Sequence, residues 1–366
     1  MSKYSCDKCG KDFKQKSHYT AHLNKKNPCL NAVNEKKKKP AKLQIIDDVV
    51  GDTDGDICSK IVAVKPLLKW VGGKTQILEK LLCKFPVEMN NYREIFLGGG
   101  SVLLALLCYA RSGAIKIHGN IYAYDLNEPL IWVYKNIQIR PTEVFTEMRK
   151  IIEEFNGCSA KGEVNRKPKN IEEAKGAKEN YYYWIRSQYN KLDINEKKTV
   201  LGSAMFIFLN KTCFRGVFRV GPNGFNVPYG HYGNPEIINK EHLDEFSKLI
   251  QGVVFECRDF SSSLSLVEEN DFVYLDPPYA PETDTSFVGY TENGFGIDSH
   301  NNLFALIHEL TETNKKMILS NADVTLVREN FNAKEKYNID SIMCKRAINS
   351  KNPEAKAKEV IIKNYA

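Results

Sequence analysis

The sequence predicts an α/β protein whose single sheet is built from two separated stretches of chain. Residues 63–135 and 251–366 alternate short apolar runs, typical of buried strands, with helical patterns. Residues 136–250, which lie between these stretches, are mainly helical in pattern. We therefore expect one α/β sheet domain with a helical subdomain inserted into it.

Bulk composition indicates a globular protein with a large core. The chain has 366 residues, of which 42% are hydrophobic, and no apolar run approaches the length of a membrane span. The N-terminus has no apolar segment of the secretory type. Ten cysteines are mostly scattered along the chain, so we expect an intracellular protein with mostly reduced thiols.

The positive charge is concentrated at the N-terminus. Residues 1–42 hold twelve lysines against three acidic residues, whereas the whole chain has a net charge of only +7. The rest of the chain is therefore slightly acidic, and any nucleic-acid affinity of the body must come from a local patch. Residues 31–62 contain a lysine run and then an acidic run, and they are predicted to be a linker.

Residues 1–30 have the ligand spacing of a small metal-binding unit. Two residues separate Cys6 from Cys9, twelve separate Cys9 from His22, and six separate His22 from Cys29. This spacing is close to that of a ββα zinc finger, whose small core would be supplied by Phe13 and Tyr19. A unit this short cannot fold on buried surface alone, which favours a metal over a basic tail with incidental cysteines. We therefore expect structural Zn²⁺ on Cys6, Cys9, His22 and Cys29.

A glycine turn follows the first predicted strand of the body. The run Phe96-Leu97-Gly98-Gly99-Gly100 lies between a short strand at 94–96 and a helix at 102–109, and its glycines let the backbone approach a ligand closely. The next strand, 121–124, is followed by Asp125, whose carboxylate can bind ribose hydroxyls. Either feature alone is explained as well by packing.

The run Asp276-Pro277-Pro278-Tyr279 is the most informative of the chain. It ends the apolar strand 272–275 abruptly, because proline has no N–H for the sheet ladder. The Asp276 carboxylate and the Pro277 carbonyl can accept hydrogen bonds from an exocyclic amine, and Tyr279 can stack on the ring that carries it. These residues predict a site that lets such an amine attack a methyl donor; an ordinary proline turn is the alternative.

Together these runs resemble the Dam family of DNA adenine-N6 methyltransferases, also called the D12 class, in its alpha arrangement. The resemblance covers about residues 66–366. It rests on runs that occur in the order of the family's motifs, at residues 68–74, 96–100, 125–127, 210–216, 225–230, 276–279 and 359–365.

The resemblance implies a Rossmann-like, S-adenosylmethionine-dependent methyltransferase sheet with an inserted target-recognition subdomain. It implies cofactor contacts at Trp70, Lys74, Asp125 and Asp276, and a position near the cofactor's adenine for Asp259 and Phe260. The expected cofactor set also includes Gly72, Phe96, Gly98 and Gly100. The expected catalytic set is Asp276, Pro277, Pro278 and Tyr279.

The expected partner is double-stranded DNA, from which the target adenine must flip to reach the site. Three aromatic residues after the catalytic run either close over the flipped base or pack in the core: Phe287, Tyr290 and Phe295.

For sequence reading, the resemblance implies that Lys69 and Arg219 contact guanines of GATC, and that Val217 and Pro228 lie against bases. Arginine suits the guanine edge in the major groove, so Arg215 is expected to bind DNA too. Arg215 and Lys211 depart from the family's usual asparagine and arginine, and phosphate contact is the alternative for both. Arg346 is expected to touch a backbone phosphate. GATC is the expected site.

The chemistry expected is direct transfer without a covalent intermediate, since no cysteine lies in a Pro-Cys nucleophile motif. Two alternatives are open: a non-catalytic zinc-finger DNA-binding protein that retains the methyltransferase fold, and an enzyme acting on RNA or single strands. The family occurs in restriction–modification, replication marking and viruses. We expect a location in the cytoplasm or nucleus, or in a virus-infected cell, and no membrane association.

Overall fold

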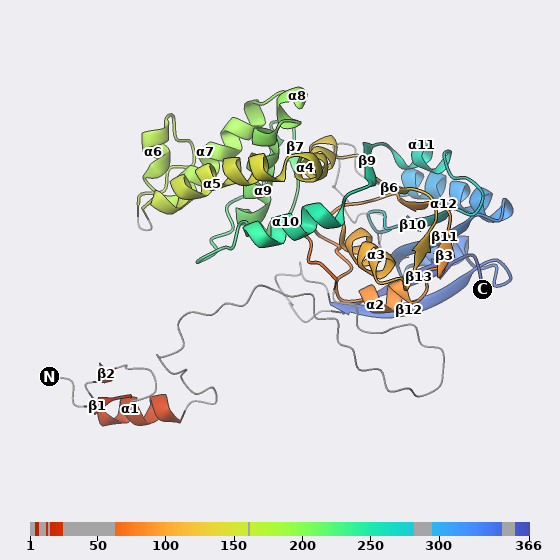
Figure 1. Ribbon diagram of the computed structural model, residues 1–366, viewed down its shortest axis with the longest axis horizontal. Coiled ribbons are helices and arrows are strands. Elements are labelled where there is room, and N and C mark those ends of the chain that lie inside the picture. The colour runs from red at the N-terminus through yellow and green to blue at the C-terminus, as the bar shows by residue number, and fades with distance from the viewer. Residues whose placement is uncertain are drawn as a thin grey trace. The chain divides into compact units, whose positions relative to one another are not determined.

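The computed structural model describes residues 4–6, 12–13, 15–24, 63–159, 162–281, 295–345 and 356–366. The chain divides into two compact units, Met1–Gly55 and Asp56–Ala366, whose elements are labelled in Figure 1. Several residues predicted above lie outside the described residues: Cys9, Cys29, Phe287, Tyr290 and Arg346.

Within its described residues, the larger unit has a seven-stranded sheet of order β12-β13-β11-β10-β4-β6-β9. The five strands from β11 to β9 in this order are parallel, and β13 and β12 are added antiparallel at one edge. Their bounds are β4 Tyr92–Glu94, β6 Ile121–Asp125, β9 Val253–Cys257, β10 Phe272–Leu275, β11 Lys316–Ala322, β12 Asn338–Lys345 and β13 Lys356–Lys363.

The predicted α/β class and most of the predicted strands are confirmed. The apolar runs at 121–124, 253–255, 272–275, 317–319 and 360–362 are β6, β9, β10, β11 and β13. The strand expected at 94–96 lies slightly earlier, as β4. Strand β12 was not predicted because its residues show no regular alternation of polar and apolar side chains.

Helices cover both faces of the sheet, as its continuous apolar strands require. On one face the core includes residues of α2 (Leu78–Leu82), α3 (Ser101–Arg111), α4 (Glu128–Ile139) and α10 (Lys240–Leu249). On the other face a second core includes residues of α11 (Phe260–Leu264), α12 (Ile297–Glu312) and α13 (Thr325–Asn330). The helix expected at 102–109 is confirmed as α3.

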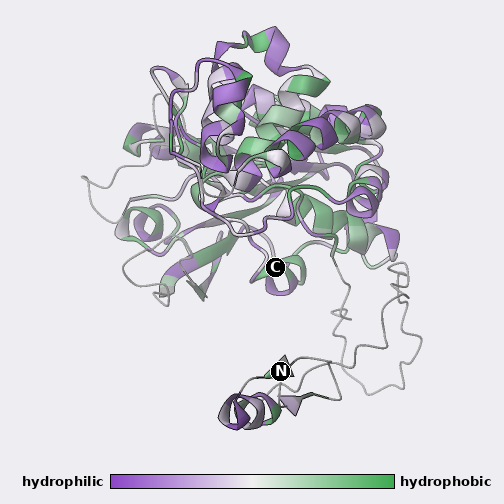
Figure 2. Cartoon of the chain, turned by 90° about the vertical axis from the view of Figure 1, so that its left-hand side faces the viewer, coloured by the Kyte–Doolittle hydropathy of each residue, from purple (hydrophilic) through white to green (hydrophobic). Residues whose placement is uncertain are grey.

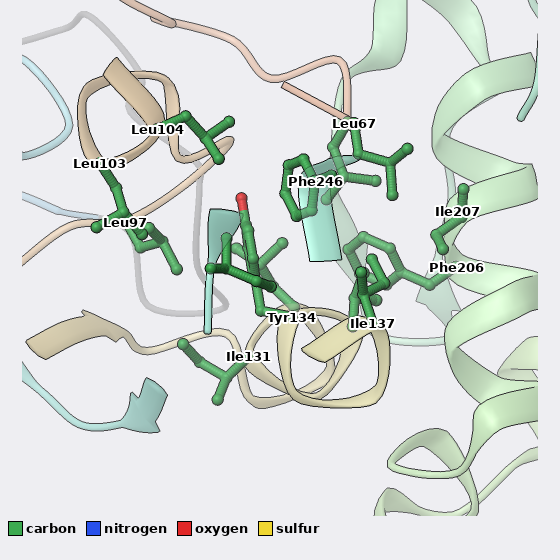
Figure 3. Packing of buried hydrophobic residues seen from close by; sticks show 14 of the residues in the cluster. Leu67, Leu97, Leu103, Leu104, Ile131, Tyr134, Ile137, Phe206, Ile207 and Phe246 are labelled. Carbon is green, nitrogen blue, oxygen red and sulfur yellow. The ribbon is translucent and has the colours of Figure 1, made fainter. Parts of the chain in front are cut away.

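The first core is densely packed around Tyr134. Figure 3 shows Tyr134 rising from α4 near Ile131 and Ile137, with its hydroxyl on the side of Leu103 and Leu104. That hydroxyl donates a hydrogen bond to the Gly98 carbonyl over 3.0 Å. Through this hydrogen bond, the packed core also holds the backbone of the glycine turn.

A buried ion pair joins the two central strands. Arg93 of β4 contacts Asp271, next to the start of β10, over 2.6 Å between Nε and Oδ2. Asp271 also accepts a hydrogen bond from the side chain of Asn91, and Arg93 donates to the hydroxyl of Tyr124 on β6. Since both charges are buried and hydrogen-bonded, this network holds β4, β6 and β10 in register.

A second group of helices lies beside the sheet in Figure 1. Aromatic side chains join them, since Phe155 packs edge-on against Phe208 and Tyr181 does the same. Their bounds are α5 Pro141–Gly157, α6 Ile171–Lys175, α7 Lys178–Lys191, α8 Ile194–Lys197 and α9 Val200–Thr212. After α9 come the 3₁₀ turn η1 (Phe214–Gly216) and a small hairpin of β7 (Val220–Gly221) and β8 (Gly224–Phe225). A further short parallel pair is β3 (Glu88–Met89) with β5 (Lys116–Ile117).

The smaller unit has two short strands followed by a helix. Strand β1 (Tyr4–Ser5) pairs antiparallel with β2 (Asp12–Phe13), and α1 spans Lys16–Leu23. Tyr19 packs against Phe13, as the sequence predicted, with ring centroids 5.9 Å apart.

Hydropathy follows burial in the larger unit: Figure 2 shows hydrophobic residues on the inner helices and strands and hydrophilic ones on outer faces. Among the described residues, no helix is long and apolar enough to cross a membrane. Among the described residues, Cys108, Cys158, Cys213, Cys257 and Cys344 are free thiols, and Cys83 is disulfide-bonded.

Candidate active site

The site lies where the strand order of the sheet reverses, between β4 and β10. Strands β6 and β9 follow β4 on one side, whereas β10 and β11 lie on the other. In open α/β sheets, ligands bind outside the carboxyl ends of the strands at such a point. Because Tyr274 pairs with Glu94, the chain after β10 and the glycine turn after β4 lie side by side. Tertiary structure therefore brings the two strongest sequence motifs together.

Asp276 follows β10 directly and forms an ion pair with Lys74. The Lys74 Nζ lies 2.8 Å from the Asp276 Oδ2, and the two side chains are only 5% and 19% exposed. Lys74 is held in place because its Nζ also donates to the Gly72 carbonyl and its backbone N–H donates to Ser101 Oγ. The predicted cofactor residue Lys74 thus contacts the predicted catalytic acid, and Gly72 holds the same lysine amine.

Burial raises the pKa of Asp276 from 3.8 to about 6, although Lys74 acts in the opposite direction. A negative charge at Glu359 adds to the rise in this pKa. At neutral pH the carboxylate is ionised and has acceptor capacity beyond its contact with Lys74. It is therefore able to accept a hydrogen bond from an amine.

Tyr279 follows the two prolines directly and lies beside the same lysine. The Lys74 Nζ is 4.9 Å from the centre of the Tyr279 ring. The Tyr279 hydroxyl donates to Glu359 of β13 over 2.8 Å, and burial raises the pKa of this phenol well above its ordinary value. The ring is thus anchored at its outer end, as a stacking platform requires.

The glycine turn adopts backbone conformations that L side chains rarely adopt. Gly98 and Gly100 have φ of 49° and 67°. A Cβ on Gly98 would lie 2.8 Å from the Trp70 ring, so Trp70 packs directly on the turn. Trp70 also stacks on Phe218, with centroids 5.7 Å apart. It therefore connects the predicted cofactor turn with the predicted recognition segment.

Asp125 closes the glycine turn from the neighbouring strand β6. Its Oδ2 accepts from the Gly98 N–H and its Oδ1 from the Asn127 N–H, both over 2.9 Å. Burial raises the pKa of Asp125, while these backbone bonds oppose the rise. A further backbone bond comes from Leu126, and the carboxylate keeps acceptor capacity that a ribose hydroxyl can use.

Three aromatic rings gather beside the turn and pack against one another. Phe96 stacks on Phe260 at 6.1 Å, and Phe295 packs against both at 5.9 and 5.7 Å. Phe295 is buried. Of the two predictions made for this residue, packing in the core is therefore correct and covering the flipped base is wrong. Asp259 caps α11 by accepting from the Ser262 N–H and hydroxyl.

The predicted DNA-reading residues form a second cluster around Lys69. Asn210 binds both the N–H and the carbonyl of Lys69, over 2.9 and 2.7 Å. The Lys69 Nζ lies 3.8 Å from the centre of the Tyr232 ring and donates to the Lys211 carbonyl. Burial lowers the pKa of Lys69, and burial and Lys69 lower that of Lys211.

Four further predicted DNA contacts lie along the segment that follows α9. Arg219 is exposed and donates to the side chain of Asn226 over 2.6 Å; Pro228 is exposed as well. Val217 and Arg215 are half-buried. Arg215 has a φ of 55°, a left-handed conformation that asparagine tolerates better than arginine. The backbone here thus explains why asparagine is the usual residue.

In the smaller unit, the structure describes two of the four predicted zinc ligands. Cys6 is buried, and His22 lies on α1 with its ring 4.9 Å from Phe13. Among the described residues, no group of three or more His, Cys, Asp or Glu side chains is arranged to hold a metal.

Sequence reasoning assigned no role to four polar residues at the site: Glu94, His300, Asn321 and Glu359, the last of which begins the run 359–365. Burial raises the pKa of Glu94 to about 8, and its carboxyl accepts from the Tyr92 hydroxyl. His300 and Asn321 touch the chain next to Tyr279. The available signal for Asn321 was that polar residues follow the apolar run 317–319 directly within β11. The other three residues lie in ordinary helix or strand patterns.

The sequence was compared with protein families and with curated proteins. The family of D12 class N6 adenine-specific DNA methyltransferases matches residues 70–348. The chain is 36% identical to the type II methyltransferase M.MjaIII of Methanocaldococcus jannaschii, over 82% of this chain and 99% of that protein. It is 28% identical to the type II methyltransferase M1.LlaDCHI of Lactococcus lactis subsp. cremoris, over 83% and 96%. It is 26% identical to the DNA adenine methylase of Escherichia coli K12, over 82% and 95%.

The family's match spans most of the chain and includes both the glycine turn and the Asp276 turn. It agrees with a site in which the half-buried Asp276 carboxylate lies beside the glycine turn. The chain therefore belongs to the D12 class of N6 adenine-specific DNA methyltransferases.

Proposed function

We propose that this enzyme methylates an adenine that has flipped out of double-stranded DNA, and that its site is GATC. The catalytic part of this proposal is supported by the Asp276 carboxylate. It pairs with Lys74 next to the glycine turn, at the point where the strand order of the sheet reverses. An acceptor at this point is suited to the amine of a base, which cannot reach it from within a duplex.

Asp276 and Pro277 are the groups that would prepare the amine. The carboxylate and the Pro277 carbonyl accept the two N–H groups of the adenine N6, so that the nitrogen lone pair is turned out of conjugation with the ring. When bound, S-adenosylmethionine supplies the methyl group on its sulfonium. Lys74 keeps the carboxylate ionised, and Tyr279 holds the base by stacking. Catalysis then comes from position and from polarisation of the amine.

The residues around the glycine turn fit S-adenosylmethionine. Gly98 and Gly100 have no side chains, and their positive φ is a conformation that other residues rarely adopt. Asp125 borders the turn and suits ribose hydroxyls, and the rings of Phe96 and Phe260 suit the adenine of the cofactor. Trp70, Gly72 and Lys74 complete this set.

Reading of GATC is assigned to the cluster of Lys69 and the segment after α9. Exposed Arg219 and the Lys69 amine are donors that suit guanine, while Val217 and Pro228 offer apolar contacts to bases. Hydrogen bonds join the two parts of this segment, since the Phe214 N–H donates to the Pro228 carbonyl over 2.8 Å. Residues 136–250 would thus act as the target-recognition subdomain of a catalytic domain formed by 63–135 and 251–366.

The smaller unit is assigned as a zinc finger with Cys6, Cys9, His22 and Cys29 as ligands. Its strand–strand–helix order and the small core of Phe13 and Tyr19 support this assignment. The expected zinc content is one ion per chain, and His22→Ala should lower it. A chain without zinc after purification in zinc-containing medium would exclude the finger.

Methyl incorporation into defined substrates tests the target. A duplex with one GATC should accept methyl groups, whereas a duplex with one altered base pair, the single strand and the matching RNA should accept far fewer. Digestion with nucleases that sense GATC methylation then identifies the base. Asp276→Ala is the control: it should abolish transfer and leave DNA binding intact. Equal transfer to the altered duplex would exclude GATC without touching the catalytic assignment.

A further inference from the structure

Among the described residues, no backbone hydrogen bond of the sheet ladder holds the chain that follows Asp276. The ladder between β10 and β11 ends at the pair Leu275 and Leu319. The next residues of the chain are Pro277 and Pro278, which have no N–H to donate. Strand β11, in contrast, continues through Ala322. The position of the Tyr279 backbone must therefore depend on side chains.

Asn321 supplies one such contact from the end of β11. Its Oδ1 accepts from the Ala280 N–H over 2.9 Å and from the Ala322 N–H over 2.8 Å. Asn321 is fully buried at 0% exposure. Its side-chain oxygen thus takes the place of a ladder carbonyl, immediately after Tyr279.

The other half of the Asn321 amide is unsatisfied. In the described part of the chain, its Nδ2 is buried and has no hydrogen-bond partner. A buried, unsatisfied donor costs about 1–3 kcal/mol. Stability therefore explains asparagine at this position poorly. The contact of its Oδ1 with the Ala280 N–H explains it better.

His300 supplies the second contact from the first turn of α12. This histidine is also fully buried, at 0% exposure. Its Nε2 lies 3.1 Å from the Pro278 carbonyl, immediately before Tyr279, and its Nδ1 lies 3.0 Å from the Gly296 carbonyl.

The two contacts of His300 are not equivalent. The Gly296 carbonyl already accepts from the His300 backbone N–H over 3.1 Å, as part of the helix. A neutral imidazole carries one N–H. With its hydrogen on Nε2, the ring donates to the Pro278 carbonyl, which receives no hydrogen bond from the helix. This tautomer therefore gives both the Pro278 and the Gly296 carbonyl a donor.

We propose that His300 and Asn321 are positioning residues for methyl transfer, which hold the Pro278 carbonyl and the Ala280 N–H so that Tyr279 stays aligned to stack on the target base. The inference rests on the proposed roles of Asp276 and Tyr279. Glu359 of β13 in addition accepts from the Tyr279 hydroxyl. The three consecutive residues 278–280 are thus held by side chains of α12, β13 and β11. Asp276 itself is held separately, by Lys74.

Substitutions of His300 separate its two contacts. Glutamine places an amide N–H near the position of Nε2, whereas asparagine places one near Nδ1. His300→Gln should keep kcat within about threefold of wild type, while His300→Asn and His300→Leu should lower it about 10- to 100-fold, the range expected for misplacement of a reacting group by about 1 Å. The dissociation constant for S-adenosylmethionine should stay unchanged.

Asn321→Ala should lower kcat to a similar extent. With DNA that carries 2-aminopurine at the target position, this variant and His300→Asn should both alter the fluorescence of the flipped base, because the stacking platform has moved. The KM for DNA should change little, since the recognition residues lie elsewhere.

One matched control lies on the same helix as His300, and the other contacts the same strand as Asn321. His308 is on α12 and its Nδ1 contacts the Tyr337 hydroxyl over 2.6 Å. Asn364 accepts from the N–H of Met317, at the other end of β11, over 2.8 Å. His308→Asn and Asn364→Ala should keep wild-type kcat after correction for the folded fraction measured by urea unfolding.

Three results would overturn the inference. They are equal activity of the His300→Gln and His300→Asn variants, losses of kcat that follow the folded fraction, and equal losses in the two controls. Full turnover by Asp276→Ala would instead remove the site assignment itself. If Asp276→Ala is inactive and the His300 and Asn321 variants are normal, only the present inference fails.

Discussion

At the scale of single residues, the central feature is a carboxylate that ionises just below neutral pH. Burial raises the pKa of Asp276 to about 6, and Lys74 limits the rise. Because this pKa is above the unfolded value of 3.8, ionisation in the folded state costs stability as the pH rises from about 4 to about 6. In return for this loss of stability, the site has an ionised hydrogen-bond acceptor at neutral pH.

The pH dependence of methylation should show this ionisation. We expect kcat/KM to rise with pH through a midpoint near 6, since the ionised form of Asp276 is the stronger hydrogen-bond acceptor for the amine. Lys74→Met removes the charge that lowers the pKa, so the midpoint should move to higher pH and activity at pH 6.5 should fall about tenfold or more. Initial rates across pH 5–9 measure both effects.

Lys116→Met is the matched control for this prediction. Lys116 also pairs with a carboxylate, that of Glu88 at 2.9 Å, but both side chains are well exposed. Its pH profile should coincide with that of the wild type. A Lys74→Met profile with an unchanged midpoint would show that another group controls the acid limb.

At the scale of elements, the glycine turn depends on the helix that follows it. Gly100 is the N-cap of α3 with a φ of 67°, and Gly113 follows the C-cap with a φ of 80°. A Cβ on Gly100 would lie 2.8 Å from the Tyr134 hydroxyl, whereas one on Gly113 would meet nothing within 4 Å. Only the first glycine combines backbone conformation with close packing.

Alanine substitutions at the two ends of α3 should therefore differ. Gly113→Ala should cost about 1 kcal/mol from backbone conformation alone. Gly100→Ala should cost about 1–3 kcal/mol more, because Tyr134 must move and its hydrogen bond to the Gly98 carbonyl breaks. Gly100→Ala should also weaken S-adenosylmethionine binding. Urea unfolding and cofactor titration measure these changes; equal free energies of unfolding for the two variants would contradict the packing argument.

At the scale of the whole molecule, charge and catalysis belong to different parts of the chain. Residues 1–42 hold twelve lysines and three acidic residues, while the catalytic sheet and the helices beside it belong to the unit Asp56–Ala366. Since affinity from phosphate contacts depends on salt, the contribution of the N-terminal part is measurable apart from sequence reading.

Deletion of residues 1–42 should make DNA binding less sensitive to salt. The slope of log K against log salt should become shallower by about 0.9 for each phosphate that the shortened chain no longer neutralises, while kcat and the choice of site stay the same. Replacement of Lys36 to Lys39 by glutamine in the full chain separates the lysine run from the proposed finger. An unchanged slope in the deletion variant would exclude phosphate binding by this part of the chain.

Local sequence patterns were sufficient for the parts of this protein that depend on neighbouring residues. Apolar runs, glycines and prolines act over a few positions, so they predicted the main strands, the glycine turn and the Asp276 turn. The order of those runs was enough to predict the methyltransferase family, which the comparisons confirm.

The meeting of distant residues at the site, in contrast, is visible only in the folded chain. The Lys74–Asp276 pair, the contacts of His300 and Asn321 on either side of Tyr279, and the burial of Phe295 all join separate elements. The contacts between such residues carry no local signal, because a side chain has the same sequence pattern in a helix or strand whatever it touches. Their roles follow from pairing across the sheet and from burial, which raises the pKa of Asp276 and makes each polar contact beside it matter.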